Sequence, residues 1–208
     1  MVCIPLAAFR RLPSFQQTRL SSGEPAVTGC GSEICSMKKK IGAPVDDFGL
    51  ASIDGEKVTL QAVLTGKKAA VVVFWSSICS HCSHYDAYLN GFTARHPEIG
   101  IVAVASKQRE TASQLRTNAM KRRLTFPILH DPTGQVAERW VALQTPLVFL
   151  LDPNHVLLYR GAIDNRNFPS GREKAAYLET AIDEFLAARP VTRHEIANFG
   201  CAIENGLS

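Results

Sequence analysis

Two cysteines three positions apart, Cys79 and Cys82, follow an apolar run that extends from Ala69 to Trp75. The run lacks the polar alternation of a half-exposed strand, so it predicts a strand buried on both faces. A C-x-x-C pair placed directly after such a strand, where a helical pattern begins, is typical of a redox-active dithiol. The spacing allows the two sulfurs to close a small disulfide ring and to open it again. Cys79 and Cys82 are therefore the candidate catalytic residues.

The position of each cysteine predicts its role. Cys79 is expected in the first turn of a helix, where unpaired backbone N–H groups favour a negatively charged sulfur. It is thus the expected nucleophile, and Cys82 is placed to break the mixed disulfide that forms. His81 lies between them and is a candidate to stabilise the Cys79 thiolate, which would make the disulfide a stronger oxidant. The alternative is that His81 is a solvent-exposed bystander.

The chain divides into three parts by composition. Residues 1–40 carry six Lys/Arg and two Glu, which accounts for the net charge of +4, and they show no sustained period. They are expected to be a disordered or targeting lead, followed by one domain over 41–190 and a tail over 191–208. The remaining 17 basic and 17 acidic residues balance. A neutral domain argues against nucleic acid as a partner.

The sequence is compatible with more than one cellular compartment. No apolar run is long enough to span a membrane. The short apolar stretch from Val2 to Phe9 precedes Arg10 and Arg11 instead of following a basic region, so it is a poor secretory signal. A cytoplasmic location is favoured on that ground, with the periplasm or an organelle as alternatives. Translation from Met37 is a further alternative.

Hydrophobic periods predict an α/β domain with the order β-β-α-β-α-β-α-β-β-α. The expected helices are one after the cysteine pair that Pro97 ends, one around Leu115, one capped by Asp131 with Pro132 in its first turn, and one that Pro190 ends. The expected strands are 57–60, 69–75, 100–105, 126–129, 147–151 and 156–159. The last two form a hairpin across the turn-type tetrapeptide at 152–155.

The cysteine region and three further segments resemble the thioredoxin superfamily, and within it the redoxin branch that includes relatives of alkyl hydroperoxide reductase and thiol-specific antioxidant proteins. Phe74 to Cys82 is similar to the branch's F-W-x-x-x-C-x-x-C stretch, and Thr145-Pro146 matches the superfamily's Thr-Pro loop. Residues 131–137 and 159–165 resemble further redoxin segments. The resemblance covers about 41–190 and implies a thioredoxin-like fold, a central mixed sheet flanked by helices with a late antiparallel hairpin.

The resemblance also implies roles for individual residues. Pro146 would be cis and pack against the disulfide, and the backbone of Thr145 would pair with a bound substrate peptide. Trp75 would pack beside the active site. Many relatives carry a glutamate three residues after the second cysteine, whereas Tyr85 stands there in this chain. His84 and Asp86 are the neighbouring candidates for proton transfer.

A third thiol is expected from the tail. Gly200-Cys201-Ala202-Ile203 resembles a Gly-Cys-x-Ile motif that ends some redoxin proteins. The hypothesis is that this segment folds back so that Cys201 exchanges with the active-site pair. The alternative is a packing cysteine or a frayed end. Cys30 and Cys35 lie in a Gly/Ser-rich stretch and are taken as incidental.

Three functions compete on this sequence. The first is a thiol–disulfide oxidoreductase that acts on protein or small-molecule thiols and disulfides and needs no cofactor. The second is a thiol peroxidase that uses Cys79 with Ser76 and Arg160, although Val72 stands where such enzymes carry a proline. The third is a metal-binding chaperone, in which the ligands would come from a compact cluster of cysteines and histidines: Cys79, His81, Cys82 and His84. No metal is expected under the first two.

Overall fold

The computed structural model describes residues 39–168 and 174–204. Contacts divide the chain into Met1–Gly31 and Ser32–Ser208, and every described residue belongs to the second unit. The expectation of a disordered lead therefore falls almost entirely outside the described residues. No helix in the described part of the chain is long and apolar enough to cross a membrane.

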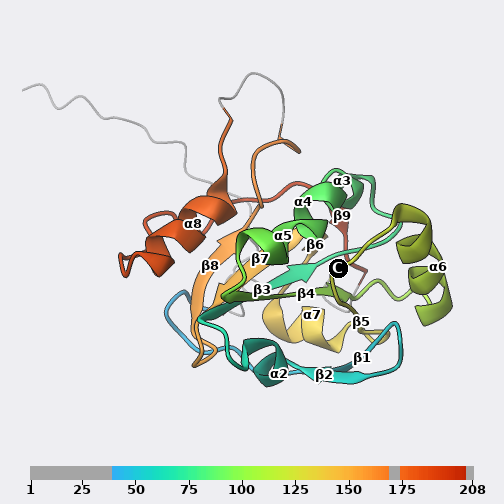
Figure 1. The fold of residues 1–208 in the computed structure, drawn as a ribbon. Helices are drawn as coiled ribbons and strands as arrows, with labels where there is room; N and C mark the ends of the chain where they lie inside the picture. Colours follow the sequence, from blue (N-terminus) through green and yellow to red (C-terminus); the bar gives the residue numbers. More distant parts are fainter. Residues whose placement is uncertain (1–38, 169–173, 205–208) are drawn as a thin grey trace, which may run out of the picture. The chain divides into compact units, whose positions relative to one another are not determined.

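A seven-stranded mixed sheet organises the domain (Figure 1), with the strand order β2-β1-β5-β4-β3-β7-β8. The strand β3 pairs in parallel with β4 and antiparallel with β7, and β7 continues into an antiparallel hairpin with β8. The strands of this sheet are β1 (Gly49–Ser52), β2 (Lys57–Thr59), β3 (Ala69–Phe74), β4 (Ile99–Ala105), β5 (Ile128–His130), β7 (Leu147–Leu151) and β8 (Leu157–Gly161). The predicted mixed sheet and late hairpin are confirmed.

Helices cover both faces of the sheet. They are α2 (Leu60–Leu64), α3 (Ser80–Ser83), α4 (Asp86–Asn90), α5 (Phe92–Arg95), α6 (Ala112–Arg122), α7 (Gln135–Trp140) and α8 (Tyr177–Leu186). Alternate residues of β3 enter two separate cores. Val71 and Val73 pack with the helices α3 to α6 and α8, whereas Val72 and Phe74 pack with α2 and α7. This explains why β3 has no polar alternation, since every residue in it is buried.

The helix expected after the cysteine pair is wrong as a single element. It is broken into α3, α4 and α5. The backbone leaves helical geometry at Tyr85 (φ −108°, ψ 3°), whereas Gly91, between α4 and α5, keeps right-handed helical angles (φ −85°, ψ 0°). The Tyr85 side chain is buried, and its hydroxyl donates to Asp164 at 2.8 Å. The i, i+3, i+4 pattern is real, but a tertiary contact bends the chain within it.

Other elements also differ from the prediction. Asp131 was expected to start α7 directly, yet the helix begins at Gln135 after Gly134, which holds φ +69° in the left-handed region that glycine adopts without strain. The Asp131 carboxylate still accepts from the backbone N–H groups of Val136 and Ala137. The strand predicted at 126–129 lies at Ile128–His130 instead. The strand β1 and the short helix α2 were not predicted.

A second, two-stranded sheet joins the tail to the domain. β6 (Gln144–Thr145) pairs antiparallel with β9 (Cys201–Ala202), with Thr145 opposite Cys201. Ile203, the residue after β9, is buried in the core that contains Trp140. This small sheet lies beside α3, where the cysteine pair is found (Figure 1).

Candidate functional site

The cysteine pair lies just beyond the end of the buried strand β3. β3 ends at Phe74, a short loop follows, and Cys79 is the N-cap residue of α3 with Cys82 one turn later. Both thiols are free, and both residues are buried, Cys79 with 2% and Cys82 with 0% of its surface exposed. The predicted juxtaposition at the start of one helix is present, although that helix is only a single turn.

The Thr-Pro loop lies against Cys79. The Thr145–Pro146 peptide bond is cis, and the Cys79 Sγ is 3.2 Å from the Thr145 carbonyl oxygen. These residues are 66 positions apart in the sequence. β6 therefore brings the two predicted segments together at one site.

Cys201 is the third thiol at this site. The pairing of β9 with β6 places it opposite Thr145, whose hydroxyl lies 3.4 Å from the Cys201 carbonyl oxygen. Cys201 and Cys79 shift each other's pKa in opposite directions: Cys201 lowers the pKa of Cys79, and Cys79 raises the pKa of Cys201. Cys201 itself is partly exposed. The fold-back expected from the tail motif is present in this arrangement, and the redox role of Cys201 stays a prediction.

The three thiols differ in acidity. The hydrogen bond from the Cys82 thiol is the largest influence on Cys79 and lowers its pKa to about 4, against the opposing effect of burial. Burial raises the pKa of Cys82 well above its ordinary value, and the hydrogen bond to Cys79 adds to this. Burial likewise raises the pKa of Cys201. Disulfide exchange requires a thiolate as the nucleophile, and Cys79 is the thiol of the three whose pKa is lowered.

Trp75 and His81, two further predicted site residues, differ in the contacts that their side chains make. Trp75 is fully buried, and its ring packs at 5.9 Å from the ring of Phe126 and 5.1 Å from the Arg122 guanidinium. The Nδ1 atom of His81 is buried and has no partner among the described residues. His81 is not among the groups that shift the pKa of Cys79. Its stabilising role therefore stays a prediction.

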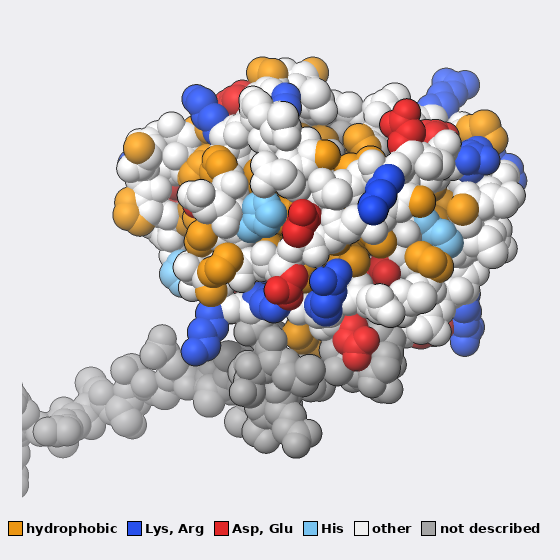
Figure 2. All heavy atoms as spheres, turned by 90° about the horizontal axis from the view of Figure 1, so that it is seen from below, with side chains coloured by type: hydrophobic (Ala, Val, Ile, Leu, Met, Phe, Trp, Pro, Cys, Tyr) orange, Lys and Arg blue, Asp and Glu red, His pale blue; other side chains and the backbone are white. Residues whose placement is uncertain are grey.

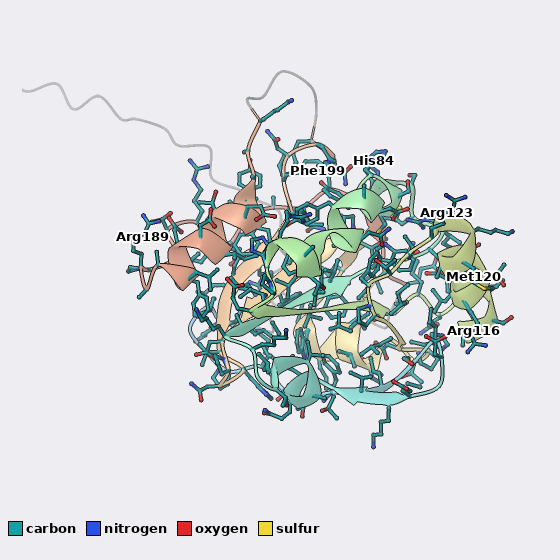
Figure 3. The ribbon with its side chains drawn as sticks, viewed as in Figure 1. His84, Arg116, Met120, Arg123, Arg189 and Phe199 are labelled. Carbon is teal, nitrogen blue, oxygen red and sulfur yellow. The ribbon has the colours of Figure 1, made fainter. Side chains whose placement is uncertain are left out.

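The candidates for proton transfer to Cys82 are engaged elsewhere. The Nδ1 atom of His84 lies 2.8 Å from the Asn167 side-chain oxygen, and Asn167 also reaches the Phe199 carbonyl oxygen (Figure 3). Asp86 forms an ion pair with Arg122. Burial and the hydrogen bond to Asp164 raise the pKa of Tyr85, so its hydroxyl stays protonated.

Three side chains that the sequence analysis missed hold the loop before Cys79. Ser77 donates through its backbone N–H and its hydroxyl to Glu110, at 2.8 and 2.5 Å, and Glu110 is 2% exposed. Asn118 and Arg122 of α6 contact the hydroxyl and the carbonyl of Ser77. Their i, i+4 spacing on one helix was a signal that they share a face. Fixing Ser77 in this way positions Cys79.

The residues named for the two alternative functions lie in other environments. The Arg160 guanidinium, the cation considered for peroxide chemistry, bonds to the Lys39 carbonyl oxygen and to Glu195. Among the described residues, no group of three or more His, Cys, Asp or Glu side chains is arranged to hold a metal ion. The His81 and His84 rings are 6.2 Å apart in an edge-to-face contact.

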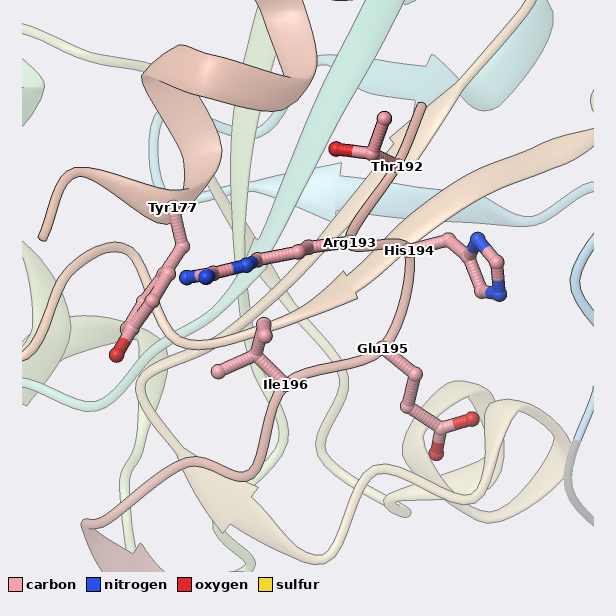
Figure 4. Close-up of a pocket in the computed structure, with 6 residues that line it drawn as sticks. All are labelled: Tyr177, Thr192, Arg193, His194, Glu195 and Ile196. Carbon is pink, nitrogen blue, oxygen red and sulfur yellow. The ribbon is translucent and has the colours of Figure 1, made fainter. Parts of the chain in front are cut away.

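Two further surface features lie away from the thiols. A pocket beside α8 is lined by six residues, Tyr177, Thr192, Arg193, His194, Glu195 and Ile196, and the Arg193 side chain points toward Tyr177 (Figure 4). None of the three thiols contributes to it. The face shown in Figure 2 intersperses basic and acidic side chains with scattered apolar ones.

Comparison with known proteins connects this geometry to a family. The family described as AhpC/TSA matches residues 41–160. The thiol-disulfide oxidoreductase ResA of Oceanobacillus iheyensis is 26% identical over 117 residues, which cover 55% of this chain and 61% of that protein. The chain spans between 61 and 64% of the length of the curated relatives it matches.

Solved structures show the same architecture. A hypothetical protein from Sinorhizobium meliloti is 26% identical with a TM-score of 0.73, and the match covers 82% of this chain and 97% of that one. The thioredoxin domain of a thiol-disulfide oxidoreductase from Bacteroides vulgatus is 21% identical with a TM-score of 0.50, over 59% of this chain and 89% of that one. The fold is thus thioredoxin-like.

Proposed function

The chain belongs to the AhpC/TSA family, and we propose that it is a thiol–disulfide oxidoreductase in which Cys79 and Cys82 alternate between dithiol and disulfide. The observation that carries this proposal is the geometry of the pair: both thiols are free at the start of α3, and the Cys79 Sγ lies 3.2 Å from the carbonyl oxygen of Thr145, the residue before the cis Pro146. The lowered pKa of Cys79 and the raised pKa of Cys82 support it. The name thiol-disulfide oxidoreductase among relatives supports the same chemistry.

The proposed cycle follows from the two thiols. In the reducing direction, the Cys79 thiolate attacks one sulfur of a disulfide, and a mixed disulfide forms as a thiolate leaves. The Cys82 thiol then loses its proton and attacks Cys79, which releases the second thiol and leaves the Cys79–Cys82 disulfide. Two electrons pass to the substrate, and no cofactor takes part. The reverse sequence oxidises a dithiol.

Positioning is the contribution of the surrounding residues. The Thr145 carbonyl oxygen and the cis Pro146 lie on one side of Cys79, while Glu110 holds Ser77 on the other. Fixed geometry around a nucleophile raises the fraction of encounters that lead to exchange. Protein disulfides and small disulfides are the proposed substrate classes.

Removal of the second cysteine tests this cycle. We expect Cys82→Ser to lower the turnover of insulin disulfide reduction by dithiothreitol about 100-fold or more, because the mixed disulfide can no longer be resolved by the pair. The matched control is Cys35→Ser, the same substitution at a cysteine outside the described residues, which should retain the wild-type turnover. Full turnover in Cys82→Ser would show that Cys82 is not part of the exchanging pair.

A further inference from the structure

The redox pair is covered by the tail. Cys79 is 2% exposed and Cys82 is fully buried, although disulfide exchange needs an incoming sulfur to reach Cys79 along the S–S axis. Cys201 packs against the same core cluster that contains both cysteines, and it pairs through β9 with Thr145, whose carbonyl oxygen lies 3.2 Å from the Cys79 Sγ. Part of the cover over Cys79 is therefore itself a thiol.

Specific contacts keep the tail in this position. The Gly200 backbone lies so close to the Thr-Pro loop that a Cβ atom at this position would stand 1.9 Å from the Thr145 carbonyl oxygen. Asn198 donates to the Pro146 carbonyl oxygen at 3.1 Å, and the Ile203 N–H donates to the Leu143 carbonyl oxygen at 2.8 Å. With the Ile203 side chain 1% exposed, the segment on both sides of Cys201 is anchored.

Cys201 differs from the pair in its access to solvent. Its surface is partly exposed, whereas Cys79 and Cys82 are buried. The nearby positive charge of Lys107 favours the ionised form of Cys201, in opposition to burial. It is therefore the thiol of the three that an external disulfide meets first.

On the basis of the proposed function, we propose that Cys201 is a further catalytic residue, a relay thiol through which external disulfides exchange with the buried Cys79–Cys82 pair. The substrate class is then a disulfide that can reach a partly exposed thiol at the edge of β9. The tail need not leave the site during exchange.

The relay consists of three thiol–disulfide exchange steps, and atoms and electrons balance in each. The Cys201 thiolate attacks the substrate disulfide, forms a mixed disulfide and releases the first substrate thiolate, which takes up the proton that Cys201 lost. The Cys79 thiolate attacks the Cys201 sulfur, so that a Cys79–Cys201 disulfide forms and the second substrate thiolate leaves. Cys82 attacks Cys79, forms the Cys79–Cys82 disulfide and returns Cys201 as a thiol, with the Cys82 proton passing to a thiolate leaving group. One S–S bond forms and one breaks in each step, and the substrate gains two electrons.

A rate comparison on the full chain tests the relay, in a background where Cys3, Cys30 and Cys35 are replaced with serine. The readout is the oxidation of the reduced protein by oxidised glutathione, followed by quenching and mass spectrometry. We expect Cys201→Ser to slow the formation of the Cys79–Cys82 disulfide at least about tenfold, because access then requires displacement of the tail. A Cys201→Ser rate equal to or above that of the background protein would overturn the relay.

A rescue variant separates access from misfolding. Gly200→Ala must move the tail away from Thr145, so Gly200→Ala combined with Cys201→Ser is expected to regain the background rate within about threefold, since Cys79 is then uncovered. Ala202→Ser is the matched control, because this exposed position of β9 accepts one extra atom without a clash. A double variant as slow as Cys201→Ser would also contradict the proposal.

The intermediate provides the second readout. In Cys82→Ser, oxidised glutathione should produce a Cys79–Cys201 disulfide, detected as a cross-linked peptide. A stable glutathione adduct on Cys79 in its place would argue for direct attack and against the relay. This result differs from the one expected if the proposed function itself is wrong. In that case the background protein, with Cys201 intact, would form no Cys79–Cys82 disulfide.

Discussion

Cys79→Ser is expected to abolish two-electron disulfide reduction, with the rate falling by about 10⁴-fold or more, as is typical when an enzyme loses its nucleophile. The reason lies in the acidity of the three thiols. Cys79 has a pKa lowered to about 4, whereas burial raises the pKa of both Cys82 and Cys201. Without Cys79, the buried Cys82 is mostly protonated near neutral pH, and an exchange that begins at Cys201 stops at its mixed disulfide.

The measurement is a single turnover of the reduced protein with oxidised glutathione, with the released glutathione counted. In the background where Cys3, Cys30 and Cys35 are replaced with serine, the protein should release two glutathione molecules per active site, and Cys79→Ser at most one, through an adduct on Cys201. The background protein with Cys79 intact is the control. Release of two molecules by Cys79→Ser at more than a tenth of the original rate would exclude Cys79 as the nucleophile.

The thiolate of Cys79 should persist at acidic pH. With a pKa of about 4, Cys79 is almost fully ionised at pH 6, whereas a thiol with the ordinary value of roughly 8.5 would be about 0.3% ionised, a difference of about 300-fold. The folded-state pKa lies below the unfolded one, so ionisation of Cys79 stabilises the reduced protein at alkaline and neutral pH. This stabilisation is lost as the pH falls toward 4.

Thiolate absorbance at 240 nm measures this titration. Cys82→Ala should raise the Cys79 midpoint the most, because the hydrogen bond from Cys82 is the largest influence on it and alanine cannot donate one, and Cys201→Ala should raise it by less. Cys79→Ser must remove the acidic transition altogether. A transition that stays in Cys79→Ser, or that first appears near pH 8, would contradict the assignment of the stabilised thiolate.

Local patterns were sufficient for the centre of the fold. The run from Ala69 to Phe74 forms the buried strand β3, and the turn-type tetrapeptide at 152–155 joins the hairpin of β7 and β8. The cysteine pair was found for the same reason, since its spacing and its place after a strand are both contained in nine consecutive residues. Each of these features depends on neighbours in the chain.

The surroundings of the site depend on distant residues and were predicted less well. The break at Tyr85 involves Asp164, which is 79 positions away, and the loop before Cys79 is held by Glu110, 33 positions from Ser77. Neither partner is marked by a local pattern. Thr145 and Cys201 are 56 positions apart, and their pairing was not predicted; a resemblance of the tail to related proteins led us to expect only that this segment folds back toward the cysteine pair.

The burial of Cys79 is the feature that sequence analysis could not supply. Hydrophobic periods predicted that the pair follows a buried strand, but the cover over it comes from an irregular segment with one short strand. Because Gly200 has no side chain, its backbone can lie close to the Thr145 carbonyl oxygen. A contact of this kind produces no periodic pattern in the sequence. The limited access of a substrate to Cys79 is therefore visible only in the folded structure.

Equilibration of the protein with glutathione buffers of known potential, followed by alkylation and peptide mapping, tests the central claim most directly. The account predicts that Cys79 and Cys82 lose their thiols together in one two-electron transition, at a potential above the roughly −270 mV of thioredoxin, because the reduced form holds a stabilised thiolate. The account would be contradicted if no Cys79–Cys82 disulfide formed at any potential while Cys201 alone was oxidised.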